Sequence, residues 1–181
     1  MNQEQMPLIK EIVINKPPTK WSLVYKKEKF DSKGSLVTHQ DFYLTGNLFY
    51  SDRTSYHITS KIIYESKEFL FKHLKGLPEL EKMRLEFEYH KMQDIDLDNK
   101  ANYWIKLLLD ILKTPTSRQL LRASKEKKPK PIITTNTIAD DNTKCIDEIK
   151  LKFVKGEHKM IFRIYGRVKS EQKTMDLFFV N

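Results

Sequence analysis

The chain has 181 residues, the size of one domain. Its 33 Lys and Arg residues against 24 Asp and Glu residues give a formal net charge of +9, which favours a polyanionic partner such as nucleic acid. The only cysteine, Cys145, excludes an internal disulfide framework, and one thiolate with five scattered histidines gives no basis for a Cys/His metal site. We expect a soluble, cytoplasmic protein without a membrane partner, because no segment approaches the roughly eighteen apolar residues of a membrane span and Met1–Gln5 does not resemble a secretory leader.

The N-terminal third contains one clear strand and one ambiguous region. Ile12-Val13-Ile14 is typical of a buried strand, and Pro17-Pro18 ends it, because proline cannot donate to a strand ladder. From Trp21 to Arg53, aromatic and basic residues interleave. This pattern is compatible with a surface of strands and loops that contacts phosphates, although half-buried aromatics separated by solvated lysines are the commoner arrangement.

A helix and a strand are predicted next. Residues 54–75 have apolar side chains at broadly helical spacing, and Gly76 and Pro78 supply a stop signal. After them, four apolar residues alternate with charged ones, which predicts a strand with one apolar face: Met83, Leu85, Phe87 and Tyr89. This strand leads directly into an aspartate-rich segment.

A second helix is predicted after Asn99. Its apolar face is formed by Ala101, Trp104, Ile105, Leu108, Ile111 and Leu112. Leu107 and Leu109 extend the apolar surface around the helix, which therefore needs cover on more than one side. We expect a sheet to provide one cover and a second subunit the other, which predicts a homodimer.

The C-terminal part is predicted to hold a basic insert, a hairpin and an arm. The insert occupies residues 114–137, and its most basic stretch, 116–131, is expected to be a mobile surface loop that either contacts DNA or is merely solvated. Alternating residues on both sides of Lys155-Gly156-Glu157 predict a β-hairpin. Residues 167–181 form the predicted arm, in which Met175–Val180 is an edge strand or reaches a partner. The expected fold is a single α/β (α+β) domain, with a small mixed β-sheet flanked by two main helices.

The acidic residues gather in two places. Asp94, Asp96 and Asp98 alternate before the second helix, and the pair Asp140-Asp141 follows the basic insert. Carboxylate oxygens are ligands that Mg²⁺ prefers, and Mg²⁺ can activate water and relieve charge on a phosphate. The clusters therefore indicate a metal-dependent nuclease.

The geometry expected around Asp96 and Asp98 follows from their spacing. Two residues apart in extended backbone, they would share one face, while Asp98 or Asn99 would cap the helix; for Asp98 alone, a cap is the simpler role. A calcium-binding EF-hand is excluded, since its sixth position would be Asn99 instead of glycine and its twelfth Ile105 instead of glutamate.

These motifs resemble those of the RusA-type Holliday-junction resolvases of bacteria and their phages. The matching residues are Asp96-Leu97-Asp98-Asn99 at the start of a helix, then Lys106 and Asp110-Ile111-Leu112, and then Asp140-Asp141 before the C-terminal strands. The strand before Pro17-Pro18 also looks like the opening of that family. The resemblance covers most of residues 8–166, and only its acidic motifs are specific.

The resemblance implies a homodimeric endodeoxyribonuclease that uses Mg²⁺, with Mn²⁺ as a possible substitute, to nick four-way DNA junctions symmetrically. It assigns the catalytic and metal-binding carboxylates to Asp96, Asp98 and Asp141, with Asp140 as a further metal ligand and Asp94 in an auxiliary role. The catalytic lysine would be Lys106. The family places this lysine one turn after the second aspartate, where this chain has Asn102, so Lys100 is the alternative.

Two other hypotheses remain open. Asp141 with Glu148 and Lys150 matches the Asp…Glu-x-Lys pattern of restriction-type nucleases, although Glu148 and Lys150 also fit the solvent face of a strand. In the second hypothesis the chain binds DNA without cleaving it, and the aspartates only cap the helix and interact with solvent.

Overall fold

The computed structural model describes residues 6–24, 30–50, 55–94, 96–125 and 131–169. Predictions for the remaining positions, among them residues 126–130 of the basic insert and the strand or arm at Met175–Val180, lie outside the described residues. The elements in chain order are β1 (Leu8–Asn15), β2 (Lys20–Val24), β3 (His39–Tyr43), the 3₁₀ helix η1 (Gly46–Phe49), α1 (Tyr56–Phe71), β4 (Leu80–His90), α2 (Leu97–Leu112), α3 (Ser117–Lys125), β5 (Ile146–Val154) and β6 (Lys159–Val168).

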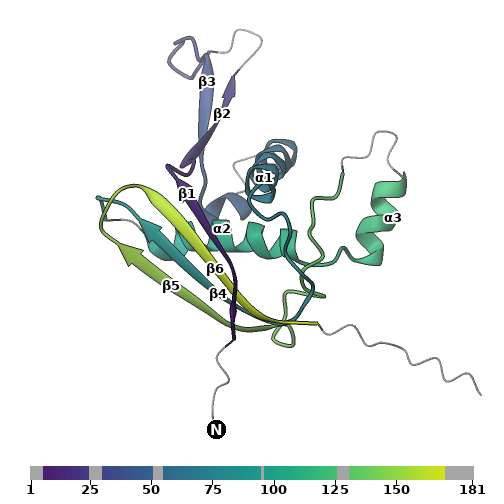
Figure 1. The fold of residues 1–181 in the computed structure, drawn as a ribbon. Coiled ribbons are helices and arrows are strands. Elements are labelled where there is room, and N and C mark those ends of the chain that lie inside the picture. Colours follow the sequence, from purple (N-terminus) through teal and green to yellow (C-terminus); the bar gives the residue numbers. More distant parts are fainter. Residues whose placement is uncertain (1–5, 25–29, 51–54, 95, 126–130, 170–181) are drawn as a thin grey trace, which may run out of the picture.

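The fold is α+β, as predicted. Its main sheet is mixed and has the strand order β1-β6-β4-β5, whereas β2 and β3 form a separate antiparallel pair that projects from the body (Figure 1). In β4 the predicted alternation is confirmed: the apolar side chains of Met83, Leu85, Phe87 and Tyr89 are buried. These side chains form the centre of the core together with Met160, Phe162 and Ile164 of β6.

The predicted hairpin of β5 and β6 is wrong. β4 lies between these two strands, paired parallel with β5 and antiparallel with β6. The turn around Gly156 therefore carries the chain past β4, and β5 becomes an edge strand of the sheet. Because β5 is parallel to β4, α2 and the segment after it form the crossover that joins the two strands.

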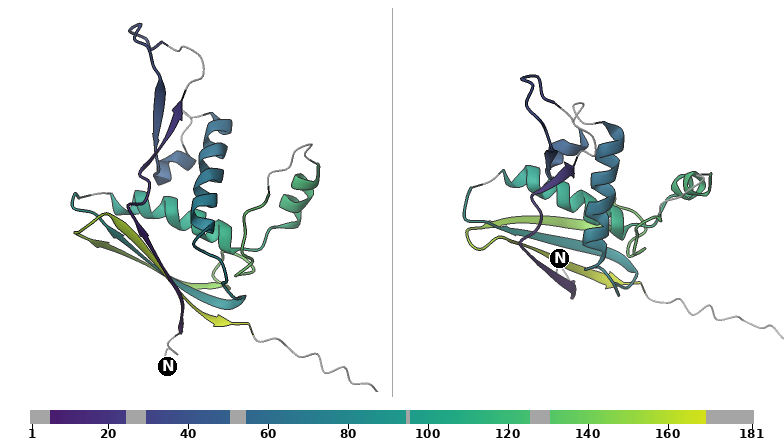
Figure 2. Two further views of the ribbon diagram at one scale, coloured as in Figure 1. Left: turned by 45° about the horizontal axis from the view of Figure 1, so that its top comes forward. Right: turned by 90° about the horizontal axis from the view of Figure 1, so that it is seen from above.

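The two main helices lie on one side of the sheet, with α2 nearest to it (Figures 1 and 2). Ser55 caps α1 by accepting a hydrogen bond from the backbone N–H of Ile58, and Gly76, with φ of 77°, follows the end of the helix. α2 buries its predicted apolar face between the sheet and α1, where Trp104 contacts Phe69. None of the described helices is long and apolar enough to cross a membrane.

The second cover of α2 comes from the same chain. η1 and α1 pack on the sides of α2 that the sheet leaves open, and Tyr103 of α2 is completely buried, with its hydroxyl 2.8 Å from the hydroxyl of Ser66 on α1. The apolar extent of α2 therefore gives no argument for a second subunit, and this part of the reasoning toward a homodimer was wrong.

The basic insert contains a helix where a loop was predicted. Thr116 caps the start of α3, since its hydroxyl accepts a hydrogen bond from the N–H of Gln119 while its own N–H donates to the Gln119 side chain. α3 buries no residue and stands apart from the body (Figure 1), so the predicted surface position is confirmed. At the other end of the chain, β6 continues to Val168 and includes the first residues of the predicted arm.

Candidate functional site

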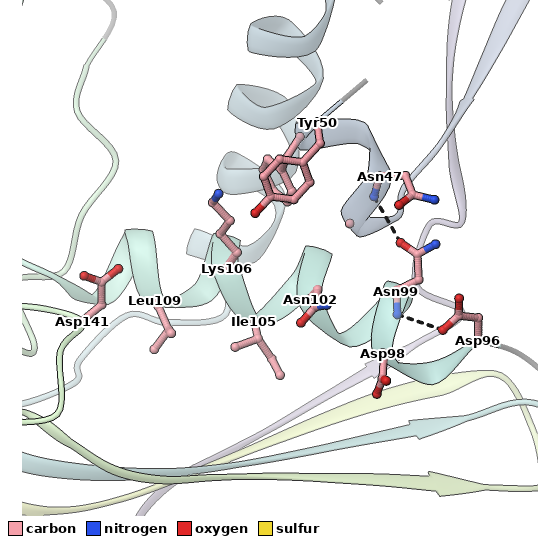
Figure 3. Close-up of a pocket in the computed structure, with 12 residues that line it drawn as sticks. Asn47, Tyr50, Asp96, Asp98, Asn99, Asn102, Ile105, Lys106, Leu109 and Asp141 are labelled. Atoms are coloured by element: carbon pink, nitrogen blue, oxygen red, sulfur yellow. Dashed lines mark hydrogen bonds between the residues drawn. The ribbon is translucent and has the colours of Figure 1, made fainter. Parts of the chain in front are cut away.

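A groove of about 710 Å³ follows the solvent side of α2. Four of the residues predicted from the sequence line it: Asp96, Asp98, Lys106 and Asp141. Figure 3 shows the first two at the N-terminal end of α2, Lys106 near its middle and Asp141 toward the other end. η1 and the residue after it form the opposite wall, with Phe49 and Tyr50 near Lys106.

Asp96 and Asp98 are positioned by the start of α2. Asp96, and not Asp98 or Asn99 as predicted, is the N-cap, and its Oδ1 accepts a hydrogen bond of 3.1 Å from the backbone N–H of Asn99. Asp98 lies in the first helical turn, so the two residues do not share a face of extended backbone. The positive end of the helix dipole favours negative charge at both positions.

The first turns of α2 are held by close contact with η1. A Cβ atom at Gly46 would lie 3.2 Å from the Cβ of Asn102 and 3.2 Å from Oδ1 of Asn99, so only glycine fits without displacement. This approach allows the backbone N–H of Asn47 to donate a hydrogen bond of 3.1 Å to Oδ1 of Asn99. The side chain of Asn99 is thereby fixed between η1 and the aspartates.

Of the two candidate lysines, Lys106 faces the groove and Lys100 does not. The Nζ atom of Lys106 lies 4.6 Å from the ring centroid of Phe49 and 5.4 Å from that of Tyr50, and no carboxylate of the described residues forms an ion pair with it. Lys100 instead donates a hydrogen bond of 3.1 Å to the carbonyl oxygen of Leu44. Burial, together with the nearby charge of Lys91, lowers the pKa of Lys100.

Asp141 occupies the far end of α2. Its Oδ2 lies 3.0 Å from Nζ of Lys113, the C-cap of α2, whereas Asp96 is the N-cap. A helix of 16 residues is about 24 Å long. Oxygen ligands of one Mg²⁺ each lie about 2 Å from the ion. The expected three-carboxylate centre is therefore not assembled within one chain. Asp141 precedes β5, and because β5 runs parallel to β4, its start lies at the end of the sheet opposite to the one at which β4 leads into α2.

The remaining acidic candidates have local partners. Asp140 accepts hydrogen bonds from the N–H of Asp141 (2.9 Å) and the side-chain amide of Asn142 (2.8 Å), and these bonds lower its pKa. Asp94 lies 3.2 Å from Lys155 on the surface. Among the residues that the structure describes, no group of three or more His, Cys, Asp or Glu side chains is arranged to hold a metal ion.

The restriction-type pattern is not assembled at the groove. Glu148 and Lys150 form an exposed ion pair of 3.2 Å on β5, and neither lines the groove that contains Asp141. Their position on the outer strand agrees with the solvent-face interpretation of the sequence.

Sequence reasoning missed the wall that η1 forms. Phe49 and Tyr50 were noted only as part of an aromatic and basic region, and the Gly46-Asn47 pair, whose glycine permits the close approach to α2, was the available signal.

Comparisons of the chain with protein-family models, with curated proteins and with solved structures found no significant match. The groove and the sequence motifs are therefore the features from which a function can be proposed.

Proposed function

We propose that this protein is a Mg²⁺-dependent endodeoxyribonuclease that cleaves branched DNA, with four-way junctions as the expected substrate. The observation that carries the proposal is the position of Asp96 and Asp98 in one large groove with Lys106, in a chain with a net charge of +9. A groove that pairs carboxylates with a cation suits a metal ion bound together with a phosphate.

The donor set at the start of α2 fits Mg²⁺. This ion commonly binds through one or two carboxylates and completes its octahedral shell with waters and substrate phosphate oxygens. Asp96 uses Oδ1 for the helix cap and keeps Oδ2 for a ligand, and Asp98 would provide the second carboxylate. Mn²⁺ accepts the same oxygen donors. When bound, the ion would activate water and relieve charge on the scissile phosphate.

The other groove residues position the substrate. Lys106 would bind a phosphate oxygen, since its ammonium group lies against two aromatic rings and forms no ion pair with a carboxylate among the described residues. The backbone N–H of Asn47 orients the side chain of Asn99, which would keep Asp96 and Asp98 correctly placed relative to that phosphate. Asp141 and Lys113 would lie beyond it, at the other end of the groove.

Two further parts of the proposal derive from the resemblance to RusA-type resolvases. Symmetric nicking of a four-way junction requires two active sites, so the protein is proposed to act as a homodimer. Its proposed location is the cytoplasm. Light scattering after size-exclusion chromatography tests the dimer, because a mass near that of one chain at working concentration would contradict it.

The function is tested with a labelled four-way junction and a linear duplex of matched sequence, each incubated with Mg²⁺ or EDTA. We expect nicking of the junction only with Mg²⁺, and its loss in Asp96→Asn and Asp98→Asn. Asp94→Asn is the matched control, because this exposed carboxylate is paired with Lys155 outside the groove. Absence of metal-dependent nicking by the wild-type protein would refute the proposal.

The helix cap favours one competing function, a DNA-binding protein without nuclease activity. In it, Asp96 would serve only to accept the hydrogen bond from Asn99. Asparagine caps helices about as well as aspartate, so Asp96→Asn removes the charge while preserving the cap. If the competing function holds, wild type and variant bind the junction equally well and neither cleaves it.

A further inference from the structure

The groove carries an exposed aromatic ring that the proposed metal chemistry does not use. Tyr50 follows η1, lines the groove and has an exposed fraction of 77 %. Large aromatic side chains are usually at least partly buried, because they remove more apolar surface from water than most others. An aromatic ring kept in water beside a phosphate-binding cation is typical of sites that stack a nucleic-acid base.

Tyr50 stands on a series of rings that leads into the core. Its ring meets Phe49 edge-on, with centroids 6.5 Å apart and an interplanar angle of 67°. Phe49 in turn packs on Tyr103, at 5.3 Å, and Tyr103 is fully buried and hydrogen-bonded to Ser66. Phe49 thus contacts Tyr50 from one side, Lys106 lies over its ring, and most of the side chain remains exposed to solvent. We call the exposed ring of Tyr50, at the outer end of this series, the platform.

The ammonium group of Lys106 lies over this platform. Nζ of Lys106 is 5.4 Å from the ring centroid of Tyr50 and 4.6 Å from that of Phe49. Lys106 follows Asp98 by eight residues on the same helix, which places its backbone roughly 12 Å farther along the axis. Figure 3 shows Lys106 and Tyr50 adjacent, with the aspartates farther along the same groove. One groove thus offers a base platform, a phosphate-binding cation and carboxylates in succession.

We propose that the groove holds a single-stranded or locally unstacked segment of DNA, with one base stacked on Tyr50 and an adjacent phosphate bound by Lys106. An intact duplex cannot use this platform, since its base faces are already stacked on one another. The inference rests on the proposed function and narrows its substrate class: the site selects DNA in which a base is free to leave the stack, as at the crossover of a junction, a flap or a bubble.

The test measures binding in EDTA, so that cleavage plays no part. Fluorescence anisotropy is recorded with a labelled oligodeoxythymidylate and with a blunt duplex of equal length. We expect Tyr50→Ala to weaken single-strand binding by about tenfold, which lies within the range for loss of one stacked base, and to leave duplex binding unchanged. Tyr50→Phe keeps the ring and should bind like wild type. Tyr43→Ala is the matched control, since Tyr43 is 67 % exposed but lies on β3 outside the groove.

A second readout reports stacking itself. An oligonucleotide that contains 2-aminopurine should lose fluorescence on binding to wild type and to Tyr50→Phe, but not on binding to Tyr50→Ala. Unchanged single-strand affinity in Tyr50→Ala, or an equal loss for single strand and duplex, would overturn the inference. Cleavage is measured separately. If Tyr50 proves not to stack a base, the proposed Mg²⁺-dependent nicking still stands, and if the protein does not nick DNA, the binding data still test the stacking.

Discussion

The ammonium nitrogen of Lys113 lies 3.0 Å from Oδ2 of Asp141 and 3.1 Å from Oδ1 of Asp110. One cation at the end of α2 thus joins a carboxylate of its own helix to one in the segment that precedes β5. Burial alone would lower the pKa of Lys113, but its hydrogen bonds to Asp141 and Asp110 outweigh this effect and raise the pKa. Asp141 therefore has a structural partner in this fold.

The first prediction concerns this pair. Its side chains are partly exposed, 20 % for Lys113 and 36 % for Asp141, so solvent screens the interaction. We expect a coupling energy of about 0.5 to 1 kcal/mol from a double-mutant cycle of Lys113→Met and Asp141→Asn, measured by urea unfolding. Additive effects of the two substitutions would contradict a direct interaction.

The second prediction concerns Gly166, where β6 passes β4. A Cβ atom here would lie 2.7 Å from Cδ1 of Leu80 and 2.8 Å from the carbonyl oxygen of Lys82, and a backbone oxygen within a sheet cannot easily move. Gly166→Ala should lower the free energy of unfolding by about 1 to 3 kcal/mol. Gly156→Ala is the control, since its nearest neighbour would be 3.9 Å away. Equal denaturation midpoints for both variants would show that the sheet adapts.

The third prediction concerns the pH dependence of stability. Nε2 of His158 lies 2.8 Å from the hydroxyl of Tyr89, and burial, assisted by the charges of Lys91 and Lys100, lowers the pKa of His158. In the unfolded chain this pKa is about 6.5. Below a pH of about 6.5, the unfolded chain takes up a proton at His158 more readily than the folded state does. The contribution of neutral His158 to the free energy of unfolding is therefore complete above a pH of about 6.5 and is lost as the pH falls through its pKa in the folded state.

His158→Gln removes this titration. The variant should therefore show a flatter fall in stability below pH of about 6.5 than wild type does, in thermal or urea unfolding at a series of pH values. His57→Gln, at an exposed position on α1, serves as the control and should keep the wild-type slope. A slope in His158→Gln as steep as in wild type would assign the pH dependence to other groups.

The fourth prediction concerns α3 and the proposed DNA partner. Arg118, Arg122 and Lys125 are spaced i, i+4 and i+7, so they lie on one face of this exposed helix. If all three contact phosphates, replacing them with alanine should reduce the slope of log affinity against log salt concentration by up to about 2.7. Replacing exposed Lys72, Lys75 and Lys150 is the control. Equal slopes for wild type and the α3 variant would exclude α3 from the DNA interface.

Features that depend on local sequence were predictable. The alternation in β4 and the apolar face of α2 each follow from one contiguous segment, and both are buried as expected. α3 was missed because its start depends on the single pair Thr116 and Gln119, within a segment whose charge suggested a loop.

Features that depend on strand order were not predictable. A turn between β5 and β6 suggested a hairpin, yet both strands pair with β4 instead of with each other. The parallel pairing of β5 with β4 is what places Asp141 beside Lys113, far from Asp96. The groove wall has the same origin, since Gly46 meets Asn99 and Asn102 only after η1 has packed on α2.

The most direct test compares Mg²⁺-dependent nicking of a four-way junction by wild type, Asp96→Asn and Asp141→Asn. We predict nicking by wild type in Mg²⁺ but not in EDTA and, since Asp96 would bind the metal, a loss of at least about a hundredfold in Asp96→Asn. Asp141→Asn should stay within about tenfold of wild type, because Asp141 lies at the other end of α2. Equal nicking by wild type and Asp96→Asn, or no metal-dependent nicking by wild type, would contradict the assignment of the aspartates at the start of α2 to a nuclease site.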